Sequence, residues 1–101
     1  MPLYLTRFSY TSDAWAAFVA APADRREAVR KQLEGVGGTL HEVWYTFGAK
    51  DGIVLFDAPG DVAATAYLTK TASSGKVHGV ETTRLVTVEE MVEALKLAAT
   101  H

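Results

Sequence analysis

Apolar positions recur along this chain with two different periods, and together they predict an alternation of strands and helices. Four runs have the composition or the alternation of strands, and they cover residues 3–10, 40–47, 52–57 and 77–86. Between these runs, apolar residues lie three and four positions apart, which is the spacing of one helix face. The predicted order is strand, helix, strand, strand, helix, strand, helix.

Two of the predicted strands carry bulky side chains on both faces. In the first strand, one face is formed by Tyr4, Thr6, Phe8 and Tyr10. The other face is formed by Leu3, Leu5, Arg7 and Ser9. In the third strand, Ile53–Phe56 is apolar throughout, which is typical of an interior strand. We therefore expect both faces of these strands to be covered.

Prolines, glycines and capping residues mark the helix ends. A short helix after Thr11 ends near Pro22, because proline lacks an N–H and is tolerated only in a first helical turn. A second helix is predicted over Pro22–Gly35. A third starts in the cluster Asp57–Asp61, with Pro59 at a plausible first position, and runs to about Ser73. The segment Thr87–Glu90 has the capping-box pattern and begins a C-terminal helix.

This order of elements is that of the split βαβ, or ferredoxin-like, fold with one helix added at the C-terminus. The predicted class is α+β, with a four-stranded antiparallel sheet in the order 4-1-3-2 and two main helices on one face. At this length the chain is expected to be a single domain over residues 1–101. The second face of the sheet would expose an apolar patch in a monomer, so we expect a homodimer joined through that face.

Composition and net charge argue against nucleic acid and membranes as partners of this protein. The chain is 49% hydrophobic and 22% charged, and its formal net charge of −2 gives no basic surface for nucleic acid or an anionic membrane. No stretch approaches the ~20 apolar residues that span a bilayer. We therefore expect a cytoplasmic protein without a nucleic-acid or membrane partner. Cysteine is absent, which excludes disulfides and thiolate metal sites.

Several segments, in their order and spacing, make the chain similar to the GYD domain family, named for a Gly-Tyr-Asp signature between strands two and three. These segments are the Tyr-containing first strand, Gly37-Gly38 after an Arg-rich helix, Trp44-Tyr45, the turn from Gly48 to Asp51, Asp57-Ala58-Pro59, and Thr82-Thr83-Arg84-Leu85. Lys50 stands where the family has its Tyr, so an activity that depends on that Tyr would be lost. The resemblance implies a small ferredoxin-like protein of the dimeric α/β-barrel type, in a family mostly of uncharacterised function, with no catalytic set to carry over.

His41 and Tyr45 are the candidate catalytic residues. Both fall on the second predicted strand and on the same side of it, with Trp44 opposite. A histidine beside a phenol could act as general base and hydrogen-bond donor toward an aromatic or carbonyl substrate. Rings with polar tips are also ordinary in dimer contacts, and we favour that interpretation.

Arg7 and His78 are candidate ligand contacts on the other strands. Arg7 is a charge on a central strand, where a buried guanidinium needs a partner. Glu81 or Glu42 would supply it, which we favour; alternatively, Arg7 would hold a ligand carboxylate or phosphate. His78 falls on the edge strand opposite to that of His41, so a two-His metal site would need two subunits. We expect no metal and no cofactor.

Aromatic residues supply the walls of a predicted cleft between the sheet and the first helix. The lining expected there is Phe8, Tyr10, Trp15, Phe18 and Tyr67. The full set of candidate ligand contacts is Arg7, Tyr10, Trp15, Trp44, Tyr67 and His78. The first functional hypothesis is a protein that binds a small aromatic, carboxylate or carbonyl molecule, with or without cofactor-independent catalysis. The alternative is a regulatory or protein-interaction module without chemistry, and the residues leave open whether a reaction is catalysed.

Overall fold

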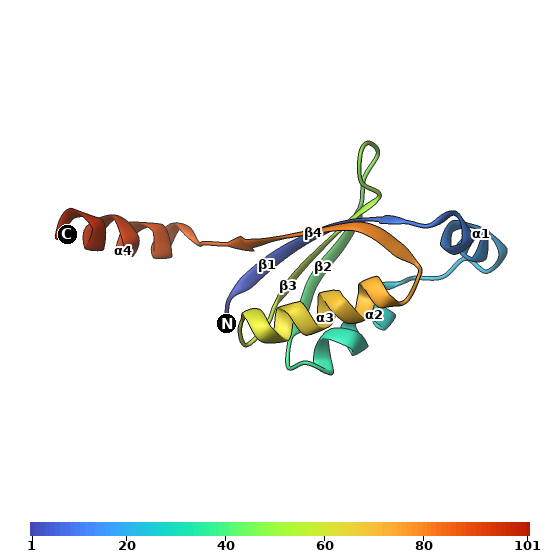
Figure 1. Cartoon of the computed structure of the whole chain (residues 1–101), viewed down its shortest axis with the longest axis horizontal. Coiled ribbons are helices and arrows are strands. Elements are labelled where there is room, and N and C mark those ends of the chain that lie inside the picture. The colour runs from blue at the N-terminus through green and yellow to red at the C-terminus, as the bar shows by residue number, and fades with distance from the viewer.

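The computed structural model describes residues 1–101 and has the predicted α+β architecture (Figure 1). Its elements in chain order are β1 (Leu3–Tyr10), α1 (Ser12–Ala20), α2 (Arg26–Glu34), β2 (Thr39–Tyr45), β3 (Gly52–Asp57), α3 (Asp61–Ser73), β4 (Val77–Leu85) and α4 (Val88–Ala99). The bounds predicted for the first and third strands are confirmed. The order of elements and the break between the first two helices are confirmed as well.

The four strands form one antiparallel sheet in the order β2-β3-β1-β4, as predicted. The register of the two central strands places Tyr4 opposite Phe56 and Thr6 opposite Val54. Residues opposite each other in a ladder share a face, so these four side chains lie on one side of the sheet. Leu5 and Leu55 are paired in the same way on the other side.

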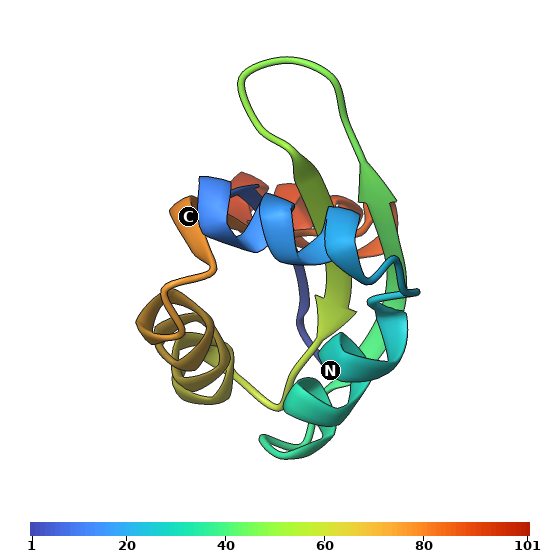
Figure 2. The same ribbon diagram turned by 90° about the vertical axis from the view of Figure 1, so that its right-hand side faces the viewer.

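Helices α2 and α3 cover one face of the sheet, which we call the helix face (Figures 1 and 2). The buried apolar cluster lies between the sheet and these two helices. It consists of Tyr4, Phe8, Leu33, Val54, Phe56, Ala58, Ala64 and Tyr67. Phe56, Leu33 and Val54 are the largest fully buried side chains. The Phe56 ring stacks on Tyr4 at 5.3 Å and meets Tyr67 edge-on at 5.1 Å. The core therefore joins the two central strands to α3.

The opposite face of the sheet, which we call the open face, is covered by no helix of the same chain. Its apolar side chains from β1 and β3 are only half-buried, and they are Leu3, Leu5, Ile53 and Leu55. Within one chain this face is open, as predicted for a monomer. Arg7, expected to be buried and paired, is exposed; Glu81 is its register partner on β4, but no ion pair joins them.

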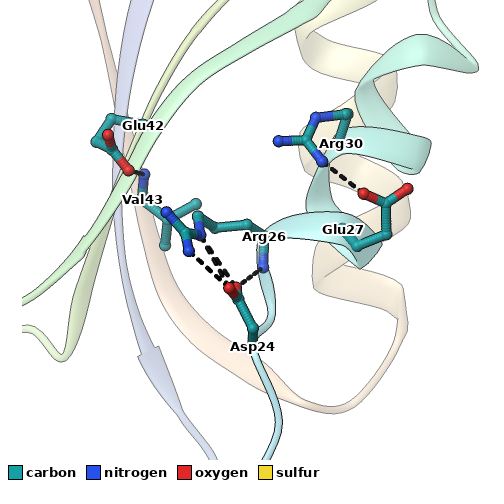
Figure 3. A network of polar contacts seen from close by, with 6 residues as sticks. All are labelled: Asp24, Arg26, Glu27, Arg30, Glu42 and Val43. Carbon is teal, nitrogen blue, oxygen red and sulfur yellow. Dashed lines mark hydrogen bonds and ion pairs between the residues drawn. The ribbon is translucent and has the colours of Figure 1, made fainter.

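Helix α2 begins at Arg26, four residues later than predicted from Pro22. Figure 3 shows the cause: the Asp24 carboxylate accepts the Arg26 backbone N–H at 2.9 Å and pairs with the Arg26 guanidinium at 2.7 Å. The hydrogen bonds from the Arg26 guanidinium, with a smaller contribution from the Arg26 backbone N–H, lower the pKa of Asp24 to about 2. An Asp bonded to the backbone two residues ahead forms a local turn that competes with helix. The segment from Pro22 to Arg25 is irregular for that reason.

Strand β2 ends at Tyr45, two residues earlier than predicted. The Thr46 N–H donates to the Asp51 carbonyl at 2.9 Å, and the Thr46 hydroxyl donates to the Lys50 carbonyl at 2.6 Å. These bonds close a wide loop over residues 46–51 instead of extending the ladder. The loop projects away from the helix layer in Figure 1 and carries a fully exposed Phe47.

Helix α4 extends beyond the end of β4, clear of the sheet (Figure 1). The predicted capping box is confirmed: the Thr87 hydroxyl accepts the Glu90 N–H at 3.1 Å, and the Thr87 N–H donates to the Glu90 carboxylate at 3.0 Å. No residue of α4 is buried. None of the helices combines the length and the hydrophobicity needed to cross a membrane.

Candidate functional site

A cavity of ≈ 80 Å³ lies between the helix face of the sheet and helices α2 and α3. Its apolar walls come from the central strands, from β4 and from both helices, and they include Phe8, Val29, Val54, Leu68, Val77 and Val80. Two of the candidate ligand contacts, Tyr10 and Tyr67, also line it. The predicted cleft is therefore present, but it is formed by α2 and α3 instead of α1.

Two buried polar atoms beside this cavity have no hydrogen-bond partner. They are Nε of Arg25 and Oγ1 of Thr71, and both residues line the cavity. A buried N–H without a partner costs about 1–3 kcal/mol, so native proteins rarely leave one unpaired. The two groups come from different elements, since Arg25 precedes α2 and Thr71 lies on α3. A molecule in the cavity could pair with both.

The position of Arg25 is set by helix α2, which follows it in the chain, and by the Phe18 ring of α1. It is the N-cap residue of α2, so its backbone belongs to the start of that helix. Its guanidinium lies 5.0 Å from the centre of the Phe18 ring, which comes from α1. A cation over an aromatic face is attracted by the ring quadrupole. Helix α1 therefore contributes to the cavity indirectly, by holding this arginine.

The charged groups at the cavity are all cationic. Arg25 and Lys76 line it, and no Asp or Glu does. Burial raises the pKa of Tyr67 to about 12, against the opposing effect of the nearby Thr71 hydroxyl. Burial also raises the pKa of Tyr10, with a further contribution from the Tyr45 hydroxyl. Both phenols thus keep their protons at neutral pH and can donate hydrogen bonds, so the cavity favours a ligand with acceptor atoms and negative charge.

Tyr10 joins the cavity to an aromatic cluster at the end of the sheet. Its ring meets Phe8, Trp15 and Phe18 edge-on at 5.1, 5.1 and 4.8 Å, and lies 6.4 Å from Tyr45. Edge-on pairs of this kind add stability beyond the area they bury. Trp15, predicted as a ligand contact, packs on this cluster and does not line the cavity; its exposed fraction is 41%.

The prediction that His41 and Tyr45 lie on the same side of β2 is wrong. The register of β2 against β3 shifts between Leu40 and Glu42, so a bulge lies at His41. A bulge adds one residue and breaks the alternation of sides along a strand. Tyr45 pairs with Gly52 on the helix face, whereas His41 bonds Asp57, which shares the other face with Leu55. The two candidate catalytic side chains therefore lie on opposite faces.

The partner of His41 is a carboxylate that the sequence did not single out as such. Nε2 of His41 lies 2.9 Å from Oδ2 of Asp57. The second oxygen of that carboxylate, Oδ1, is buried and has no hydrogen-bond partner. No cavity is associated with either residue. This pair therefore orients a histidine that lines none of the cavities.

The remaining candidates lie away from the cavity. Trp44 pairs with Ile53 and belongs to the open face, where it is half-exposed. His78 is exposed on β4 and pairs with Ser9 of β1. His41 and His78 are on opposite edge strands, as predicted from the strand order. Neither Trp44 nor His78 contacts the cavity.

The loop between β2 and β3 is fixed to the sheet by Lys50 and Asp51. Nζ of Lys50 donates to the Gly79 carbonyl of β4 at 2.6 Å. Gly79 has a φ of 60°, a left-handed conformation that favours glycine, at the irregularity where β4 shifts its register against β1. The Asp51 carboxylate accepts the Tyr10 N–H at 2.9 Å, and its own N–H donates to the Phe8 carbonyl. These residues therefore hold the end of β1, and with it Tyr10.

Replacing Asp51 with alanine is expected to destabilise the fold by about 1.5–3 kcal/mol, the usual contribution of a hydrogen bond to a charged group. The Tyr10 N–H would lose its acceptor, and the end of β1 would loosen. Urea denaturation measures this change as a lower midpoint at unchanged slope. Asp51→Asn keeps an acceptor oxygen and should lose less than half as much. Equal losses in the two variants would show that the carboxylate matters for another reason.

The model of the GYD domain family matches residues 4–95. Comparison with curated protein sequences gives no match. The matched region includes all of the four strands except Leu3, and every residue described above as lining the cavity.

Solved structures of the same fold are distant in sequence. MtbAldR matches with a TM-score of 0.62 at 13% identity, over 85% of this chain and 53% of that chain. A transcriptional regulator from Neisseria meningitidis in complex with L-Met matches with a TM-score of 0.58 at 13% identity, over 86% and 51%. A protein from Thermus thermophilus matches with a TM-score of 0.56 at 15% identity, over 87% and 96%. This chain thus spans about half the length of the first two proteins, and the similarity to all three is one of fold.

Proposed function

The chain belongs to the GYD domain family, and from its cavity we propose that it binds a small anionic molecule between the sheet and helices α2 and α3. The observation that carries this proposal is the buried Nε of Arg25, which has no hydrogen-bond partner at one apolar cavity; Oγ1 of Thr71 lies at the same cavity, next to the Tyr67 hydroxyl. An empty apolar cavity would be explained by imperfect packing alone. Buried polar groups of native proteins are paired with protein, water or ligand, and a ligand with acceptor atoms in this cavity would pair the Arg25 N–H.

The charge and size of the cavity favour a short-chain carboxylic acid. Arg25 and Lys76 are its charged residues, and a guanidinium donor matches the geometry of a carboxylate. A cavity of ≈ 80 Å³ has room for roughly two or three water volumes, so the buried part of the ligand is small. The carboxylate would lie near Arg25 and Thr71, and the alkyl part against apolar walls such as Val54 and Val80.

This proposal is one of binding and not of catalysis. The titratable groups at the cavity are two cations and two phenols that stay protonated at neutral pH, so no general base faces the ligand. A second candidate is a regulatory module in which ligand occupancy alters a partner. The shared fold with the Neisseria regulator in complex with L-Met favours it. The net charge of −2 argues against direct contact of this chain with DNA.

Thermal unfolding with a series of acids from acetate to butyrate, each compared with its neutral amide, tests the proposal. A ligand at 100 times its Kd stabilises the folded state by about 2.7 kcal/mol. In a domain of this size that raises the Tm by about 10 °C or more. We expect the acids to raise the Tm in a saturable way and the amides to have little effect. Equal effects of acids and amides, or none, would contradict anion binding at the cavity.

We also propose that the protein is a homodimer joined through the open face. Half-buried apolar residues of β1 and β3 and the half-exposed Trp44 of β2 form an apolar patch on that face, beside the exposed Arg7 of β1. Contiguous exposed apolar surface of this extent marks an interaction site. A second copy is the simplest partner, because a two-fold axis lets the same patch cover itself.

Replacing Leu55 with lysine on the open face is expected to convert the dimer to monomers at micromolar concentration. The change would bury an unpaired charge in the interface, which costs several kcal/mol. Sedimentation equilibrium of the two proteins measures the difference in Kd. The control is Val62→Lys on α3, whose side chain is 86% exposed and lies outside the open face. A wild-type protein that sediments as a monomer throughout would refute the dimer.

A further inference from the structure

Helix α4 has an apolar stripe that its own chain leaves uncovered. At 100° per residue, Val88, Met91, Val92 and Leu95 fall on one side of the helix, and Glu90, Glu93 and Leu97 on the other. The four stripe residues are between 44% and 77% exposed. No element of the same chain packs against α4, which projects from one end of the molecule (Figure 1).

A helix of this length needs a packing partner to persist. It has 12 residues, and isolated helices shorter than ~12–15 residues are marginal in water. The capping box contributes about 1 kcal/mol, which does not offset the cost of ordering a helix that buries nothing. In proteins, most of the stability of an amphipathic helix comes from packing of its apolar face. The stripe therefore indicates a surface that is covered in the functional state.

We propose that α4 of each subunit docks through this stripe on the second copy, so that the two helices complete the dimer interface. This inference rests on the proposed homodimer. The sheet face alone is small: four strands about 4.8 Å apart and about 20 Å long cover roughly 400 Å². A standard interface takes about 800 Å² from each partner.

The docked helices supply the difference in area. Helix α4 is about 18 Å long, and a stripe about 10 Å wide covers roughly 180 Å². Each subunit gains that area twice, once from its own α4 and once from the surface that the partner's α4 covers. The total then approaches the size of a standard interface.

The charges of α4 disfavour a lipid surface as the occupant of the stripe. Its polar side carries Glu89, Glu90 and Glu93 against the single Lys96. Helices that lie on membranes are rich in Lys and Arg on that side, because the lipid headgroups they meet are anionic. Anionic headgroups would repel this acidic helix, so a protein surface is the better partner for the stripe.

Two leucines of α4 provide a matched test. Leu95 lies on the stripe and Leu97 on the opposite side, yet their exposed fractions in one subunit are 61% and 62%. In an uncovered helix, Leu95→Lys and Leu97→Lys would therefore have the same effect. If the stripe docks on the second copy, sedimentation equilibrium of the full chain should show a Kd for the dimer at least tenfold higher for Leu95→Lys than for Leu97→Lys.

The possible results distinguish a failure of α4 docking from a failure of the proposed homodimer. A dimeric wild-type protein with equal Kd values for the two variants would refute docking of α4 and leave the sheet-face dimer intact. A monomeric wild-type protein would refute both. If α4 instead folded back on its own chain, Leu95→Lys would lower the Tm of the monomer without changing the Kd, and that result would also overturn the proposal.

Discussion

Replacing Arg25 with methionine is expected to weaken carboxylate binding strongly while leaving the free protein as stable as the wild type. Removing one partner of a buried, hydrogen-bonded charge pair costs about 2–5 kcal/mol in affinity, which is ~30-fold or more in Kd. The same substitution removes a buried donor that has no partner in the ligand-free state. That gain offsets the lost contact of the guanidinium with Phe18, which contributes about 0.5–1 kcal/mol.

The control for this variant is the next residue in the chain. Arg26 is exposed, pairs with Asp24 and does not line the cavity, so Arg26→Met should leave the affinity for acids unchanged. Isothermal titration with the tightest acid of the series measures Kd, and urea denaturation measures stability. If Arg25→Met bound the acid as well as Arg26→Met does, the guanidinium would have no part in binding.

Replacing Phe56 with alanine is expected to lower the free energy of unfolding by about 3–5 kcal/mol. Phe56 is fully buried, and its ring contacts Tyr4 on one side and Tyr67 on the other. The substitution removes the transfer free energy of the ring and leaves a cavity between β3 and α3. A loss of this size is a large part of the stability of a small domain.

Phe47 offers the matched control for Phe56. Its side chain is fully exposed in the loop after β2, so Phe47→Ala should change stability by less than about 0.5 kcal/mol. Urea denaturation of both variants gives the two values under the same conditions. A loss below about 1 kcal/mol for Phe56→Ala would contradict the placement of this ring at the centre of the core.

The sequence predicted those parts of the fold that depend on residues close together in the chain, such as strand patterns and helix caps. The alternation in β1 and the apolar run in β3 fixed both strands to the residue, and the capping box located the start of α4. The bulge at His41 could not be predicted, because a one-residue shift depends on how β2 meets β3 across the ladder. The late start of α2 depends on Asp24, whose side chain competes with the helix for one N–H.

The candidate site was predicted in part. Tyr10 and Tyr67 line the cavity because aromatic residues on the inner side of a strand and a helix tend to be buried there. Arg25 and Thr71 were missed, although a signal was present: Thr71 follows Tyr67 by one helical turn, and Arg25 precedes Val29 by one. The spacing predicts that these residues share a helix face. It cannot predict which polar atoms lack a hydrogen-bond partner, because that depends on how the sheet, α2 and α3 pack together.

The side-chain Nε–H resonance of Arg25 gives the most direct test of carboxylate binding in the cavity. Arg25→Met assigns the signal in a ¹H–¹⁵N NMR spectrum of the arginine side chains. On titration with the tightest acid, we predict that this resonance shifts and becomes protected from exchange, while that of Arg26 stays in place. The neutral amide of the same acid should leave both unchanged. An Arg25 signal that is unaffected by saturating acid would contradict the proposed site, whatever the acid does to the Tm.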